Sequence, residues 1–338
     1  MRALSSFSLT ALFTVALLSA CGNSGGTSAN PSGGTSGEGA SDSGGAGTGG
    51  DTGGTLFGTG GGGGSGGMTS SLPPNVTFVP SDMGSYGLGD PIGADGAANT
   101  GVTGNGDGCN ILVGVVRDFK GADEPGGHPD FESFSGDAET PGLVAPNLGA
   151  DDKPVYASQC ESSGPTGNCP FGPQTTSKDD FDAWYRFVDG VNKPYLVYFQ
   201  FAANGAISTF ESTRFFPLDN AGWGNSGEDE DGVSRNFHFT TELHTKFQYM
   251  GGETFSFSGD DDLWVFINKH LAIDLGGLHP ARDGQVDLDQ AAANLGIQKG
   301  NIYDLELFHA ERHTTASHFR VDTNLAFVDC GTVLPDPQ

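Results

Sequence analysis

The sequence predicts an all-β protein, an antiparallel β-sandwich or barrel preceded by a flexible, disordered tether rich in Gly and Ser. From about residue 107 onward, short runs of Phe, Val, Leu, Ile and Tyr alternate with Gly-, Pro- and Asp-rich turn segments, a spacing typical of antiparallel strands. The preceding segment is dominated by Gly, Ser and Thr and contains the run GTGGGGGSGG. Such a composition has too little apolar surface to offset the entropy lost on ordering.

Residues 1–20 have the properties of an export signal. One positive charge, Arg2, precedes an apolar stretch from Leu9 to Leu18 that is too short to span a membrane. The following sequence LSAC resembles the lipobox of bacterial lipoproteins, whose Cys becomes the lipidated first residue of the mature chain. The resemblance implies that acyl chains on Cys21 anchor the protein in a membrane, and we expect a location at the outer membrane or cell surface.

The chain therefore divides into four predicted segments: the signal at 1–20, the lipidated Cys and linker at 21–106, one folded domain at 107–332, and a tail at 333–338. The formal net charge is −27, and the acidic excess lies mainly in the folded segment. A nucleic acid is therefore not an expected partner, whereas divalent cations are attracted. An acidic surface that only keeps an exported protein soluble is the alternative.

Four cysteines remain once Cys21 is set aside, an even number in an exported domain, which suggests disulfides. Three pairings are possible. We prefer Cys160 with Cys169, across a short loop, and Cys109 with Cys330, which joins the two ends of the domain. A zinc site of four cysteines is the competing interpretation, but the sequence lacks CxxC spacing.

The expected strands follow one another from Ile111 to the C-terminus, and only one segment, Asp287 to Leu295, is predicted to be helical. Asp287 or Asp289 would cap that helix and Gly296 would end it. The sequences TFSFSG and NFHFTTEL alternate apolar and polar residues, so one face of each of these strands should meet solvent. The predicted strands are 111–119, 184–188, 195–201, 236–250, 254–259, 263–268, 270–277, 302–311 and 319–329.

Three adjacent acids, Asp260, Asp261 and Asp262, stand directly before the apolar strand LWVFI. Adjacent negative charges at the edge of a core repel one another unless water, a cation or a positive neighbour is present. Carboxylate oxygens are the ligands that calcium selects, so the pattern favours a calcium site. The alternative is a solvated turn, because Asp is common in turns for its own hydrogen bonds.

A second group of candidate ligands lies in IYDLELFHAERH, where a period of two places His309, Glu311 and His313 on the same face as the core residues Leu305 and Leu307. The two histidines flanking Glu311 allow a zinc site, although their order differs from the helical HExxH of zinc hydrolases. The alternative is a local ion pair of Glu311 with the next residue and histidines bonded to backbone carbonyls.

Several longer segments, among them HPDFES, FDAWYRFVDGVN, GGETFSFSGDDDLWVFINKHLAIDLGG and LFHAERHTTASHFRVDTNL, resemble the fibro-slime domain of bacterial and amoebal surface proteins over about positions 110–328. That family is similar to the protective-antigen-type (PA-fourteen) lectin-like β-sandwich superfamily. In its lectin members two adjacent acids joined by a cis peptide hold a calcium ion that also binds sugar hydroxyls. The matching pair here is Asp260-Asp261, while Asp262 stands where many relatives have Gly.

The resemblance also implies that further ligands come from the loop Glu311 to Ser317. Glu311 and Asp262 are additional metal candidates, and His313, Thr314 and Ser317 are candidate contacts to the ligand. Trp223, in a Gly-rich loop, is a candidate for stacking on a sugar ring, whereas Trp264 in mid-strand is expected in the core. Glu228 to Asp231 is either a second cation loop or a solvated run of charge.

We therefore expect a lipid-anchored adhesion or binding module that recognises surface glycans or a matrix polysaccharide through calcium. The first alternative is a structural protein of an extracellular matrix or slime that needs no metal. A metal-dependent hydrolase using His309, Glu311 and His313 is the second. Because the predicted folded domain at 107–332 has no GxSxG motif and no phosphate-binding loop, we expect no enzymatic activity.

Overall fold

The computed structural model describes residues 75–93, 98, 100–102, 108–157, 159–162 and 169–334. The predicted signal, Cys21 and most of the predicted linker lie outside these residues. All pairings between strands in the described part of the chain are antiparallel. The predicted all-β fold is therefore confirmed. None of the described helices is long and apolar enough to cross a lipid bilayer.

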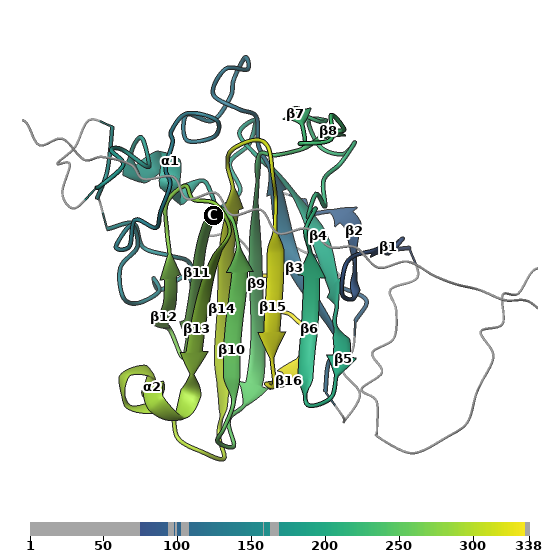
Figure 1. The fold of residues 1–338 in the computed structure, drawn as a ribbon, viewed down its shortest axis with the longest axis vertical. Helices are drawn as coiled ribbons and strands as arrows, with labels where there is room; N and C mark the ends of the chain where they lie inside the picture. Colours follow the sequence, from purple (N-terminus) through teal and green to yellow (C-terminus); the bar gives the residue numbers. More distant parts are fainter. Residues whose placement is uncertain are drawn as a thin grey trace, which may run out of the picture. The chain divides into compact units, whose positions relative to one another are not determined.

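The described strands form two large sheets and a small hairpin (Figure 1). The larger sheet runs in the order β1 (Val79–Pro80), β2 (Ser85–Pro91), β4 (Lys193–Gln200), β3 (Ile111–Asp118), β9 (Phe239–Gln248), β14 (Ile302–Glu311), β11 (Asp262–Ile267) and β12 (His270–Leu275), with β16 (Ala326–Asp329) paired to β9. The smaller sheet runs in the order β13 (Arg282–Asp287), β10 (Thr254–Gly259), β15 (Phe319–Thr323), β6 (Ile207–Ser212) and β5 (Ala202–Asn204). The hairpin is β7 (Gly227–Glu228) with β8 (Ser234–Arg235).

The two sheets pack face to face around the main hydrophobic core. Phe255 and Phe257 of β10 are buried in this core, while Ser256 and Ser258 between them are partly exposed. This is the alternation predicted for TFSFSG, because successive side chains of a strand point to opposite faces. The same prediction for NFHFTTEL was wrong: residues 236–243 are all buried, since the connection between β3 and β4 covers the polar face of β9, where the hydroxyl of Thr240 donates to the carbonyl of Trp184. Phe319 of β15 contacts the larger sheet, with its ring centroid 5.5 Å from that of Phe199 of β4.

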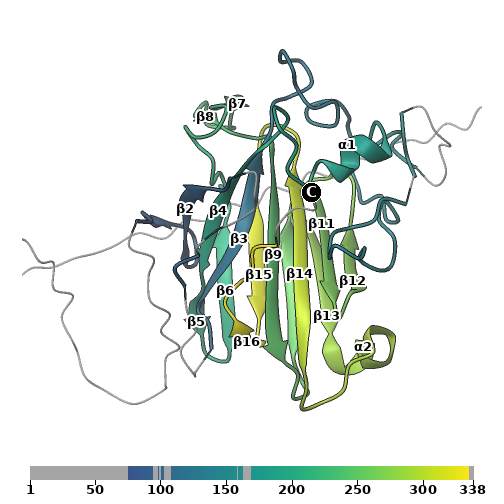
Figure 2. The same ribbon diagram turned by 180° about the vertical axis from the view of Figure 1, so that it is seen from behind.

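A second apolar cluster covers the other face of the larger sheet at β11 and β14. Trp264 and Phe308 from these strands pack against Phe181 and Trp184 of the long connection between β3 and β4. That connection contains α1 (Lys178–Asp182) and lies beside β11 and β12 when the molecule is seen from behind (Figure 2). Strand β14 is therefore buried on both faces, and Trp264 is a core residue, as predicted.

The one predicted helix is present as α2 (Leu288–Leu295). The side chain of Asp287 accepts a hydrogen bond from the backbone N–H of Gln290 at 3.0 Å, so Asp287 rather than Asp289 is the cap. Gly296 ends the helix in the left-handed conformation, with φ of 66°, which glycine adopts without steric cost. The disulfides join Cys109 to Cys330 and Cys160 to Cys169, which is the pairing preferred from the sequence.

The predicted start of the folded domain at residue 107 was wrong, because β2 belongs to the larger sheet. Tyr86 pairs with Phe199 of β4, and its side chain is buried in the main core. The glycines that gave this segment the composition of a linker allow close packing instead. A Cβ at Gly87 would lie 2.5 Å from Cγ1 of Val76, and one at Gly89 would lie 2.7 Å from the ring of Tyr198.

Two further expectations also need correction. Residues 184–188 are not a strand but follow α1 as turns, and Trp184 is buried because it packs on the outer face of the larger sheet. A short apolar run shows that a segment is buried without showing its conformation. The predicted tail begins too early, since Val333 packs against an apolar cluster that contains Ile111 and Val113.

Candidate functional site

The Asp260-Asp261 pair lies in the connection between β10 and β11, at the edge of the sandwich. The peptide bond between the two residues is cis, the geometry that the family resemblance implies. Oδ1 of Asp260 accepts a hydrogen bond from the backbone N–H of His318 at 2.5 Å. Oδ2 of Asp261 accepts one from the backbone N–H of Arg312 at 3.1 Å. Backbone from two other parts of the chain therefore orients both carboxylates.

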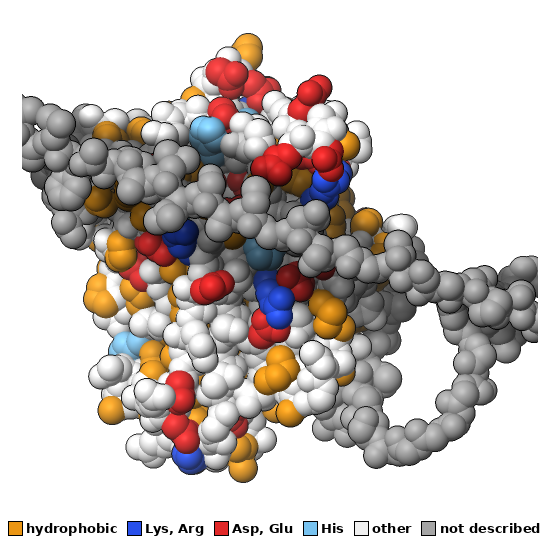
Figure 3. All heavy atoms as spheres, viewed as in Figure 1, with side chains coloured by type: hydrophobic (Ala, Val, Ile, Leu, Met, Phe, Trp, Pro, Cys, Tyr) orange, Lys and Arg blue, Asp and Glu red, His pale blue; other side chains and the backbone are white. Residues whose placement is uncertain are grey.

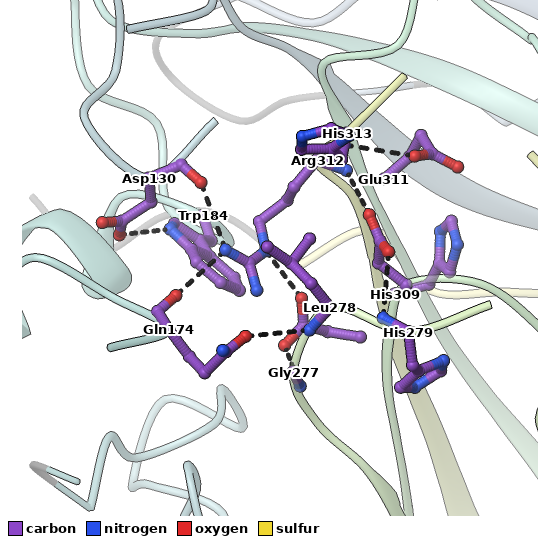
Figure 4. Close-up of polar contacts among 12 residues, drawn as sticks. Asp130, Gln174, Trp184, Gly277, Leu278, His279, His309, Glu311, Arg312 and His313 are labelled. Carbon is purple, nitrogen blue, oxygen red and sulfur yellow. Dashed lines mark hydrogen bonds and ion pairs between the residues drawn. The ribbon is translucent and has the colours of Figure 1, made fainter. Parts of the chain in front are cut away.

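Asp262, the third acid, is neutralised inside the protein. Its Oδ2 lies 2.6 Å from Nε of Arg312, and both side chains are fully buried. Nη1 of Arg312 also donates to the backbone carbonyls of Asp130 and Gln174, and the guanidinium lies 4.6 Å above the ring of Trp184 (Figure 4). Arg312 pairs with Asp262 and not with its neighbour Glu311, so the local ion pair considered from the sequence is absent.

Glu311, the last residue of β14, joins Asp260 and Asp261 in place of Asp262. The three acids line a cavity of about 300 Å³, called the acidic cavity here. Its other lining residues are Ser135, Gly136, Leu278, His279, Pro280, His313, Thr314, Thr315 and Ala316. Glu311 is 1% exposed, and its Oε2 has no hydrogen-bond partner among the described residues.

The structure disfavours the ionised forms of the Asp260, Asp261 and Glu311 carboxyls, because the pKa of each is raised. Burial raises the pKa of Asp261 to about 7, although the charge of Arg312 acts in the opposite direction. Burial and the charges of Asp261 and Asp260 raise the pKa of Glu311 well above its ordinary value. Burial also raises the pKa of Asp260, against the hydrogen bond from His318. The cavity therefore has carboxylate oxygens that form no ion pair with any described basic side chain.

Oxygen donors of this kind suit a hard cation such as calcium. In the described part of the chain, no group of three or more His, Cys, Asp or Glu side chains is already arranged around a common metal position. The donor chemistry nevertheless fits, because Glu311 has a buried carboxylate oxygen without a partner in a cavity that also contains Asp260 and Asp261. These are the residues that would hold the ion.

Glu132 shapes the loop on one side of the acidic cavity, and the sequence reasoning missed it. Its carboxylate accepts hydrogen bonds from the backbone N–H and the hydroxyl of Thr314, both at 3.1 Å, and contacts His238 at 3.4 Å. Although burial acts in the opposite direction, these hydrogen bonds lower the pKa of Glu132 below its ordinary value. Glu132 also has a positive φ of 57°, uncommon for a residue other than Gly. No spacing rule connects it in sequence to residue 314.

The two histidines considered for zinc have separate environments. Nε2 of His309 donates to the backbone carbonyl of Asp260 at 2.8 Å, and the ring is enclosed by Phe215, Phe239 and Phe319. Burial lowers the pKa of His309 to about 4. His313 lines the acidic cavity, and its Nδ1 lies 2.6 Å from the carbonyl of Thr314.

Of the other residues predicted to contact a ligand or a cation, only some lie at the acidic cavity. Thr314 lines the acidic cavity, whereas Ser317 is buried beside it and is not part of the lining. Trp223 borders a different hollow, and the ammonium of Lys193 lies 3.5 Å from the centre of its ring. In the 228–231 loop, Asp229 accepts a hydrogen bond from Arg235 at 3.0 Å and two from backbone N–H groups, so its charge is already compensated.

Residues 188–335 match the profile of the PA14 domain. The chain contains a PA14 domain. All three acids of the cavity lie within the matched residues, whereas Glu132 and the long connection around α1 precede them. PA14 domains are a carbohydrate-binding type of module. The disulfides are typical of exported proteins, consistent with a PA14 domain outside the cytoplasm.

Curated relatives of this PA14-containing chain come from Dictyostelium discoideum. Protein psiR is 37% identical over 214 residues, covering 60% of this chain and 20% of the relative. Protein psiD is 39% identical over 190 residues, covering 55% of this chain and 36% of the relative. Protein psiC is 36% identical over 208 residues, covering 60% and 39%. The chain thus spans less than half the length of these relatives.

Among solved structures, the PA14 domain of the antifreeze protein MpAFP is 8% identical, covers 70% of this chain and 98% of that chain, and has a TM-score of 0.26. A β-glucosidase from Kluyveromyces marxianus in complex with glucose is 16% identical, covers 25% of this chain and 10% of that chain, and has a TM-score of 0.19.

Proposed function

We propose that this protein is a cell-surface binding module that recognises glycans through a calcium ion in the acidic cavity. The observation that carries the proposal is the buried, unpartnered Oε2 of Glu311 in a cavity shared with Asp260 and Asp261. Three carboxyls with raised pKa values and no counterion are costly to bury, and a divalent cation removes that cost. The PA14 domain supports a carbohydrate as the ligand.

Asp260, Asp261 and Glu311 would hold the ion. Bound calcium accepts additional oxygen ligands, which vicinal hydroxyls of a sugar supply. His313 and Thr314 line the same cavity and would contact the sugar directly. The cavity volume of about 300 Å³ is at the lower end of the range for small-molecule sites, which suits one sugar ring. We assign binding rather than catalysis to the site.

The N-terminal sequence supports a role outside the cell. The export signal, the lipobox-like LSAC at residues 18–21 and the Gly-rich linker would display the domain away from a lipid surface. From these N-terminal features and the resemblance to fibro-slime domains, we propose that the protein acts in adhesion within an extracellular matrix or slime. One calcium-linked sugar site binds weakly, so many copies on a surface would increase the strength of adhesion.

Thermal unfolding of the mature protein with and without calcium tests the proposal. Calcium should raise the Tm of the wild type and of the control Asp123→Asn, whose carboxylate is exposed and outside the cavity. The same increase should be absent in Asp260→Asn and Asp261→Asn. A glycan array with and without chelator should show binding only when calcium is present.

Other outcomes of these measurements favour the alternatives. If calcium leaves the wild-type Tm unchanged and chelator does not alter ligand binding, the metal-independent matrix protein replaces the calcium module. Zinc in the purified protein, together with hydrolysis that Glu311→Gln abolishes, would instead establish an enzyme.

A further inference from the structure

A second hollow lies on the outward face of the smaller sheet, next to the acidic cavity. We call it the polar hollow. It has a volume of about 380 Å³ and is lined by polar side chains that include Ser258, Asp283, Gln285, His318 and Arg320. Ser258 of β10 pairs across the sheet with Arg320 of β15 and with Asp283 of β13, so these side chains share one face.

The polar hollow has hydrogen-bonding groups that no other described residue pairs with. The side chains of Ser258, Asp283 and Gln285 make no hydrogen bond to another described residue. Nε2 of His318 is shielded from solvent and has no hydrogen-bond partner in the described part of the chain, with Oε1 of Glu211 3.9 Å away. A ligand with several hydroxyl groups could satisfy these donors and acceptors together.

The charges of the polar hollow limit the class of ligand. Arg320 is held in place by Asp322 at 2.6 Å and by Glu211 at 3.0 Å. Because Asp283 lies in the same lining, acids outnumber the single arginine, and an anionic polymer would be repelled. In Figure 3 the part of this face that is not covered by grey atoms has scattered hydrophobic side chains and adjacent acidic and basic ones among uncharged polar atoms, without a broad basic patch. A neutral, polyhydroxylated ligand fits this lining.

His318 connects the polar hollow to the acidic cavity. Its backbone N–H donates to Oδ1 of Asp260, which lines the cavity, while its side chain lines the hollow. Asp260 directly follows the last residue of β10, Gly259, and is two residues from Ser258, so their Cα atoms are at most about 7 Å apart. The two sites are therefore neighbours at the end of β10, close enough for consecutive units of one ligand.

We propose that the polar hollow is a second sugar subsite, so that the protein binds a chain of neutral sugars that extends from the acidic cavity over β10 and β15. This inference rests on the proposed function, since the calcium site supplies the first sugar position. It predicts preference for an oligomer over a monomer, with the additional affinity coming from Ser258, Gln285 and Arg320.

The test is a binding assay on an array that carries glucose and mannose as monomers and as linear tetramers, with calcium present. Wild-type protein should bind a tetramer more tightly than its monomer. The double variant Ser258→Ala/Gln285→Ala removes two hydrogen-bonding groups and should weaken tetramer binding roughly tenfold, with monomer binding unchanged. Gln298→Ala, at an exposed position outside the hollow, is the matched control and should behave as wild type.

A second variant, Ser258→Tyr, fills the hollow with a large side chain, and it should abolish the preference for the tetramer while calcium still raises the Tm. Equal binding of monomer and tetramer by the wild type, or a double variant that retains the full preference, overturns the second subsite but leaves the calcium site intact. If the wild type binds no sugar, with or without calcium, both the proposed function and the second subsite are wrong.

Discussion

Nε of Arg312 lies 2.6 Å from Oδ2 of Asp262, and neither side chain is exposed to solvent. This pair connects the acidic cavity to the long connection around α1, because the same guanidinium binds the carbonyls of Asp130 and Gln174. Arg312 also donates its backbone N–H to Asp261. One residue thus neutralises one acid and orients another.

Replacing Arg312 should destabilise the whole domain. In Arg312→Met the charge of Asp262 stays buried without its counterion, with only the hydrogen bond from the backbone N–H of Gly277 left, and we expect the free energy of unfolding to fall by about 3–5 kcal/mol. Urea denaturation monitored by tryptophan fluorescence measures this loss. The double variant Asp262→Asn/Arg312→Met should recover part of it, because no buried charge remains. A loss below about 1 kcal/mol in the single variant would show that the Arg312–Asp262 pair contributes little to stability.

Glu306 should make stability depend on pH. Its side chain is 3% exposed, and Oε2 has no hydrogen-bond partner among the described residues. Burial, with the negative charges of Asp304 and Asp152, raises the pKa of Glu306 to about 8 from an ordinary value of 4.5. Between these two pH values the folded protein keeps a proton that the unfolded chain has lost, so this group reduces stability as pH rises, with a slope of up to about 1.4 kcal/mol per pH unit.

The variant Glu306→Gln isolates this contribution, because the neutral amide has nearly the same shape and does not titrate. Denaturation curves from pH 4 to pH 9 should show the wild type losing more stability than Glu306→Gln as pH rises. The exposed Glu230→Gln is the control and should follow the wild type. Parallel curves for wild type and Glu306→Gln would show that Glu306 is already ionised in the folded protein at neutral pH.

Glu132 should act as a positioning residue for the proposed calcium site. Because its carboxylate holds Thr314 by two hydrogen bonds, Glu132→Ala frees the loop that borders Glu311. Groups that orient metal ligands typically change metal affinity by 10–100-fold. We expect a loss of that size in calcium affinity by isothermal titration. Glu132→Gln, which keeps an acceptor oxygen, should recover part of the affinity. A variant that loses thermal stability but binds calcium normally would show a purely structural role.

The two disulfides should contribute unequally to stability. Cys109 and Cys330 are 221 residues apart in sequence, whereas Cys160 and Cys169 are separated by nine. A longer closed loop removes more entropy from the unfolded chain, so replacing the first pair with Ala should cost about 5 kcal/mol and the second about 2–3 kcal/mol. Chemical denaturation of the two double variants compares them. The reverse order would mean that the loop around Cys160 stabilises the native state by other contacts.

Several features of the fold and of the site could be predicted from short stretches of sequence. The alternation of TFSFSG set which face of β10 enters the core, and Asp287 with Gly296 marked the ends of α2. The Asp260-Asp261 pair was recognisable because adjacent acids before an apolar strand are unusual and match a known family. Each of these signals lies within a few residues, and short-range hydrogen bonds or periodicity are enough to interpret it.

The tertiary structure decided which charges meet. From sequence, Asp262 and Glu311 were equal candidates for metal binding. The fold places Arg312 against Asp262, whereas Glu311, in the cavity, has no counterion among the described residues. It also brings Glu132 to Thr314, across 182 residues, and adds β2 to the larger sheet. Long-range packing determines burial and therefore the cost of each charge, and neither can be read from the neighbours of a residue in sequence.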